Sequence, residues 1–174
     1  IRDFCLSRGL GDVYKRQILE RSEGVPFFLV SCAQALQMGA LDEDRAEDVP
    51  WDVAQGIRQR LAALPQTAQD VLGTAAIVGR TVPRRLLVAA TSHSEQAVAA
   101  ALTSACRARL LVEEGEHAYQ FAHDVIREVV EADLGVARRA VLHRQIAEAL
   151  ECMSGEAPIE LLAHHYGRSG EQDK

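Results

Sequence analysis

Residues 119–130, Tyr-Gln-Phe-Ala-His-Asp-Val-Ile-Arg-Glu-Val-Val, change from the spacing of a strand to the spacing of a helix within a few positions. Tyr119 and Phe121 alternate with a polar residue, which is typical of a half-buried strand. In the second half of the stretch the apolar residues fall on one stripe of an amphipathic helix. The spacing therefore predicts a strand that leads directly into a helix, with His123 and Asp124 in the first turn of that helix.

The start of a helix is a favourable place for an anion, because its backbone N–H groups are unpaired and the helix dipole is positive there. Asp124 complements that dipole, and His123 is placed to meet a phosphate. The plainer interpretation is that Asp124 is only a charge at a helix start and His123 an ordinary surface histidine. The position of the two residues alone leaves both interpretations open.

The composition favours a helical protein with an acidic surface. Hydrophobic residues make up 48% of the 174 residues but aromatic residues only 5%, so the core must consist of alanine, leucine and valine. The net charge of −6 disfavours general binding to nucleic acids or anionic membranes.

Cysteine usage and hydropathy indicate a cytoplasmic protein. The four cysteines are far apart and form no CxxC pair, so they predict neither a zinc site nor a disulfide framework. Reduced thiols are the rule in the cytoplasm. The sequence contains no apolar run of membrane-spanning length and no signal-peptide pattern.

Residues 1–17 are excluded from the functional interpretation. They lack a steady period and closely resemble a translated sequencing-adapter read, most clearly over residues 7–17, Ser-Arg-Gly-Leu-Gly-Asp-Val-Tyr-Lys-Arg-Gln. The resemblance implies an open reading frame that lacks its natural N-terminal portion. The alternative is a genuine N-terminal extension.

Residues 18–64 predict a small helical domain. Gly24 can end one helix and Pro26 can occupy the first turn of the next. An acidic, polar loop follows over residues 41–50. After it, apolar residues recur at every fourth position and predict one buried helix face formed by Val53, Ile57 and Leu61.

Residues 65–133 predict three helices followed by a hairpin, which is the order of a winged helix. Pro65 precedes the first helix, which closes at Gly79, and Pro83 begins the second. Ser92 and Glu95 have the spacing of a capping box for the third. Two strand-like segments, 110–113 and 119–121, flank the turn of the hairpin.

A winged helix raises the possibility of DNA binding, which the charges disfavour. The first half of the third helix, which begins at Glu95, contains no lysine or arginine, and Arg107 and Arg109 come only at its far end. The hairpin carries Glu113, Glu114 and Glu116, which would repel phosphates.

Residues 134–174 predict two further helices after a break at Gly135. The first has an apolar stripe and, in its first half, a basic cluster that we expect on a solvated face: Arg138, Arg139, His143 and Arg144. The second runs from Ile159 to Arg168. Its adjacent residues His164 and His165 point to different helix faces and lack further ligands at suitable spacing, so a structural role is favoured over metal binding.

Three segments resemble one protein family. They are Glu-Gly-Val-Pro-Phe-Phe-Leu (23–29), Tyr-x-Phe-x-His-Asp-x-Ile-Arg-Glu-x-Val (119–130) and Arg-Arg-x-x-Leu-His-x-x-Ile-Ala-Glu-Ala-Leu (138–150). The chain is similar to the STAND-type signal-transduction ATPases, in particular the large ATP-binding bacterial transcriptional regulators of the LuxR/MalT kind. The resemblance covers residues 18–174, the part behind the AAA-like ATPase core.

The resemblance implies roles for four residues in binding ATP or ADP, which the ATPase core mainly holds. Pro26 would contact the adenine and Gly24 would supply the turn. His123 would contact the β-phosphate of ADP in the closed state, with Asp124 as its neighbour. Many relatives have a basic residue before this histidine, whereas this chain has Ala122.

The expected protein is therefore mainly α-helical, with a small helical lid domain (18–64), a winged helix with one β-hairpin (65–133) and the start of a tetratricopeptide-like array (134–174). It contains no Gly-x-x-x-x-Gly-Lys-Ser/Thr phosphate loop, so we expect no catalysis by this chain alone. The expected partners are an ATPase core in cis, the downstream array and possible further copies of the parent, without nucleic acid or membrane. The alternative is a winged-helix module for DNA or protein binding that has no link to nucleotides.

Genomic sequence read across the position of Gln17 tests this interpretation directly. We expect an in-frame phosphate loop and an acidic strand upstream, because the resemblance places the ATPase core there. An unrelated upstream frame, or proof that residues 1–17 are genuine, would remove the basis for a nucleotide role.

Overall fold

The computed structural model describes residues 51–153 and 159–170. Gly24, Pro26 and the predicted acidic loop lie outside the described residues, as does the segment 1–17. The chain divides into two compact units, residues 1–57 and 58–174. The boundary falls within helix α4 (Trp51–Ala62), in which Val53 and Ile57 are buried as predicted, whereas Leu61 is only partly buried.

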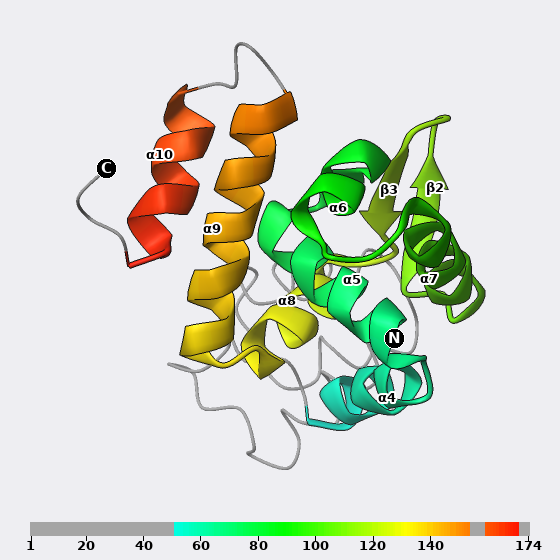
Figure 1. The fold of residues 1–174 in the computed structure, drawn as a ribbon. Helices are drawn as coiled ribbons and strands as arrows, with labels where there is room; N and C mark the ends of the chain where they lie inside the picture. Colours follow the sequence, from blue (N-terminus) through cyan, green and yellow to red (C-terminus); the bar gives the residue numbers. More distant parts are fainter. Residues whose placement is uncertain (1–50, 154–158, 171–174) are drawn as a thin grey trace, which may run out of the picture. The chain divides into compact units, whose positions relative to one another are not determined.

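Beyond α4, the described residues form six further helices and three short strands. In chain order these are α5 (Gln66–Val78), β1 (Thr81–Pro83), α6 (Arg84–Ala90), α7 (Glu95–Arg107), β2 (Leu111–Glu114), β3 (Ala118–Phe121), α8 (Asp124–Asp133), α9 (Val136–Met153) and α10 (Ile159–Arg168). The protein is thus mainly helical with a small antiparallel sheet, as the sequence predicts. The order from α5 to β3 is that of a winged helix (Figure 1). No helix in the described ranges has both the length and the apolarity needed to cross a bilayer.

Helix α5 is the centre of the second unit. Every residue from Val71 to Ile77 is buried, so this helix has no solvent-facing side over those two turns. Helices α6, α7, α8 and α9 all contact it. One core cluster joins α5, α6 and α9 and consists of Ile77, Leu86, Ala90, Leu142, Ile146 and Ala149. A helix that is apolar all round is stable only when other elements cover it on all sides.

The sheet contains a strand that the sequence analysis did not predict. It has the order β1-β3-β2, with Thr81 opposite Gln120 and Leu111 opposite Phe121. The unpredicted strand β1 has three residues, of which only Val82 is buried, so it is too short to display an alternating pattern. Its last residue, Pro83, is also the N-cap of α6, so that helix starts one residue later than predicted.

The turn between α7 and β2 has the geometry of a Schellman motif. The N–H of Leu110 donates to the carbonyl of Ala105 at 3.0 Å, and the N–H of Arg109 donates to that of Cys106 at 2.9 Å. Arg109 occupies the left-handed position with φ 56°, where glycine is usual. The motif directs the chain into β2 and buries Leu110.

The predicted capping box of α7 is wrong. Helix α7 begins at Glu95 with Ser94 as its N-cap, and the Ser94 hydroxyl accepts a hydrogen bond from the N–H of Ala97 at 3.3 Å. Glu95 is therefore the first residue of the helix and not the third, so it cannot reach back to Ser92. Its carboxylate instead accepts from Arg84 at 3.2 Å.

Helices α9 and α10 lie side by side, as Figure 1 shows, and both occur where the sequence predicts helices. Arg144 and Glu148, one turn apart on α9, form an ion pair at 3.8 Å. The prediction is wrong for His143, which is 5% exposed and packs towards α10, and not on a solvated face.

We expect the substitution Arg109→Gly to stabilise the protein by about 0.5–1 kcal/mol, because glycine adopts the left-handed conformation without a Cβ clash. Denaturant unfolding monitored by circular dichroism measures this change. The matched control is Ala108→Gly, one residue earlier, where φ is −75° and the conformation is right-handed. There glycine should destabilise by a similar amount, and equal effects of the two variants would contradict the assignment.

Candidate functional site

The first candidate site lies at the start of α8, where the sequence predicts it. Strand β3 ends at Phe121, and His123 is the N-cap of α8 with extended backbone angles of φ −149° and ψ 146°. Asp124 is the first residue of the helix. The predicted change from strand to helix is confirmed, and His123 and Asp124 lie at the helix start.

Arg80 completes this site from a distant part of the sequence. Its Nη1 lies 2.8 Å from Oδ2 of Asp124, and both side chains are about half exposed. With its amide oxygen turned towards the guanidinium, Gln120 accepts from Nε of Arg80 at 2.6 Å and from Nη2 at 3.2 Å. Two neighbours therefore hold the guanidinium beside the start of α8.

The sheet explains how Arg80 reaches this place. Arg80 immediately precedes β1, and β1 pairs with β3, so residues before β1 lie beside the end of β3. The N–H of Phe121 donates to the carbonyl of Arg80 at 3.3 Å, which extends the pairing by one residue. The strand pairing brings Arg80 next to Asp124 although 44 positions separate them in the chain.

The pairing changes the electrostatics of the helix start. An isolated Asp124 would repel a phosphate, whereas the Arg80 guanidinium offsets its charge. The backbone N–H groups of the first turn and the positive end of the dipole remain favourable for an anion. Ala122 stands where many members of the family that the chain resembles have a basic residue. In the structure, a different element supplies a guanidinium close to the same position.

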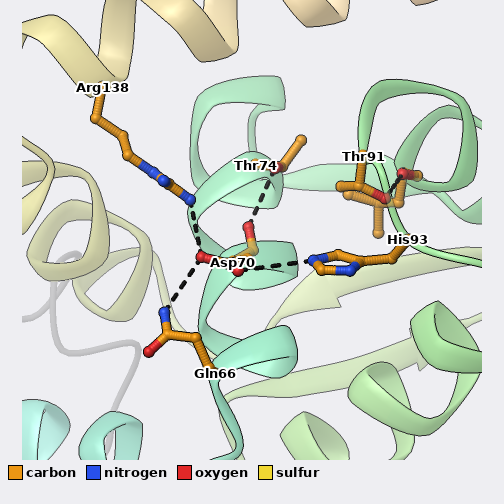
Figure 2. Close-up of polar contacts among 7 residues, drawn as sticks. Gln66, Asp70, Thr74, Thr91, His93 and Arg138 are labelled. Carbon is orange, nitrogen blue, oxygen red and sulfur yellow. Dashed lines mark hydrogen bonds and ion pairs between the residues drawn. The ribbon is translucent and has the colours of Figure 1, made fainter.

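The second candidate site is the Asp70 junction, formed by Asp70, Gln66, His93 and Arg138 (Figure 2). Asp70 lies on α5, and its Oδ1 accepts from Nη2 of Arg138 on α9 at 2.8 Å and from the amide of Gln66 at 3.3 Å. Nε2 of His93, in the loop between α6 and α7, lies 3.6 Å from Oδ2 of Asp70. One carboxylate thus joins the winged helix to the first helix that follows it.

Sequence reasoning missed the Asp70 junction. Arg138 and Asp70 are 68 positions apart, and no local spacing links them. The sequence offered only one signal, which is that Asp70 is the single charged residue of a helix whose second half is mostly apolar. Such a residue needs a partner when it is partly buried, and Asp70 is 27% exposed.

The remaining predicted site residues, Gly24 and Pro26, lie outside the described residues. Within residues 51–153 and 159–170, no group of three or more histidine, cysteine, aspartate or glutamate side chains is placed to hold a metal ion. The structure therefore brings two of the four predicted residues, His123 and Asp124, to one helix start and adds Arg80 to them.

Comparisons with known proteins leave the family open. The sequence matches no protein-family model. Searches of curated proteins and of solved structures give no significant match.

We expect Asp70→Ala to destabilise the protein by about 1–2 kcal/mol, because the Arg138 guanidinium and the Gln66 amide lose a partly buried acceptor. Thermal or urea unfolding measures the loss. Glu148→Ala is the control, since it removes a single exposed partner of Arg144 on α9 and should cost only about 0.3–0.5 kcal/mol. An Asp70→Ala variant as stable as this control would show that the junction contributes little to stability.

Proposed function

We propose that this chain is the regulatory switch segment of a nucleotide-dependent signal-transduction ATPase of the STAND type. In this proposal the protein works in the cytoplasm and controls transcription or another effector. The segment is not catalytic by itself. It packs against an ATPase core that holds ATP or ADP, and a tetratricopeptide-like array that follows it receives the signal.

The observation that carries the proposal is the position of His123. This histidine is the N-cap of α8, directly after the last strand of a winged-helix arrangement. The same helix start includes Asp124, whose charge Arg80 offsets. A histidine, a guanidinium and a helix N-terminus together have the chemistry needed to meet a phosphate.

The proposed mechanism is a shift between two packings of the winged helix. With ADP on the core, His123 contacts the phosphate, and Pro26 contacts the adenine after the turn at Gly24. Exchange for ATP, or a signal from the array, removes the His123 contact and releases the winged helix. A nearly complete shift needs a difference in binding free energy of about 5.5 kcal/mol. A charge-assisted hydrogen bond from His123 can supply part of it.

The charges of the described residues argue against direct DNA recognition by this winged helix. Helix α7 has Glu95 in its first turn and a basic residue, Arg107, only in its last. The hairpin exposes Glu113, Glu114 and Glu116. A helix and wing that enter DNA need basic side chains along the surface that faces the phosphates.

The test is His123→Ala in a parent protein that contains an ATPase core upstream of this segment. We expect ADP that stays bound during purification to dissociate from the variant at least about tenfold faster than from the wild type, because the closed state loses a phosphate contact. For the same reason we expect the variant to be active without inducer. Release of a fluorescent ADP analogue and the effector output measure the two effects.

His117→Ala is the matched control, because the ring of this hairpin histidine is exposed and lies 3.9 Å from Glu116, away from the start of α8 in the sequence. It should leave both measurements unchanged. If His123→Ala keeps its ADP and remains fully dependent on inducer, the phosphate role is wrong. Salt-sensitive binding of duplex DNA by residues 65–133 would instead support the DNA-binding alternative.

A further inference from the structure

Two buried histidines face each other between α9 and α10. Nδ1 of His143 lies 2.9 Å from Nδ1 of His165, a hydrogen-bond distance. His143 is 5% exposed and His165 only 2%. A third histidine, His164, lies close by, with its ring centre 5.2 Å from that of His165. This pair makes a buried polar contact between α9 and α10.

The hydrogen bond constrains the protons on the two rings. One Nδ1 must carry a proton and donate it, and the other Nδ1 must present a lone pair. A first additional proton can enter only on an outer ring nitrogen, where it places a charge in a buried site. A second additional proton would put two N–H groups face to face and break the bond.

We propose that His143 and His165 form an acid-sensitive clasp that holds α10 on α9 when both rings are neutral and releases it when they are protonated. This inference goes beyond nucleotide binding and does not depend on it. The ligand of this site is the proton, and the helix that protonation releases is α10.

The surrounding charges oppose protonation of the pair. Arg168 and His164 on α10, together with Arg139 on α9, act against a positive charge on His143, whereas Glu131 on α8 favours it. Burial is the largest cause and lowers the pKa of His143.

His165 is more strongly affected than its partner. Burial, followed by the charges of His143, His164 and Arg168, lowers the pKa of His165 to about 4. Of the other elements that pack on α9, α5 carries Asp70, which pairs with Arg138 of α9. Helix α6 carries Arg84, which pairs with Glu95, and the exposed Arg85.

The direction of the pH effect follows from these shifts. A histidine in detached α10 takes up a proton near pH 6.5, whereas the docked His165 does so only near pH 4. Detached α10 therefore binds more protons between these values, and docking weakens as the pH falls. The contribution of His165 to docking is fully present above about pH 6.5 and decreases progressively towards pH 4.

Amide hydrogen exchange of the full 174-residue chain tests the clasp. After correction for the intrinsic exchange rates, the opening constant of α10 should rise at least about tenfold from pH 7.5 to pH 5.5, relative to that of α5. The double variant His143→Asn/His165→Asn should lose most of this rise, because asparagine keeps a hydrogen-bonding group in place of Nδ1 but does not titrate. His164→Asn is the control and should keep most of this rise, because it removes an exposed neighbour and leaves unchanged the burial that is the largest cause of the lowered pKa values of His143 and His165.

Two results would overturn the proposal. The first is a wild-type opening constant for α10 that changes less than about twofold over this pH range. The second is an equal rise in the double variant. If that variant does not fold, NMR titration of the wild-type histidine Cε1–H signals decides the question. Either ring of the pair titrating at or above about pH 6.5 with α10 still docked would mean that the pair tolerates the proton.

Discussion

The structure depends on the complete burial of one helix. Helix α5 is buried at every position from Val71 to Ile77, so the protein must cover it on all sides. Helices α6, α7, α8 and α9 provide that cover. A Cβ atom added at Gly73 would lie 3.4 Å from Leu134, just after α8. The burial of apolar side chains around α5 therefore holds the winged helix and α9 together in one unit.

Two ion pairs help to fix the relative positions of the elements that pack around α5. Apolar contact does not fix how far one helix slides along another, whereas an ion pair joins two particular positions. Asp70 and Arg138 fix α9 against α5, and Arg80 and Asp124 fix the edge strand against the start of α8. The pair of Arg80 and Asp124 is about half exposed on both sides, so it contributes more to registration than to stability.

The sequence predicts the local features of this fold well and its long-range contacts poorly. The change from β3 to α8 and the bounds of α10 follow from spacing, because each depends on neighbouring residues. Strand β1 was missed, because a three-residue strand shows no period. The sequence predicts a solvated position for His143, because the burial of this side of α9 depends on the packing of α10, which no local spacing indicates. Arg80 was missed for the same reason, and the roles of Gly24 and Pro26 stay predictions.

The short edge strand has a consequence for the order of folding. Strand β1 pairs with β3 across all of α6, α7 and β2, so a long loop must close before the sheet gains its third strand. The hairpin and the helices involve local contacts and can form first, whereas non-local pairings form slowly. We therefore expect the contact between Arg80 and Asp124, 44 positions apart, to be among the last to form. A nascent or partly folded chain would possess α8 before it possesses the guanidinium at its start.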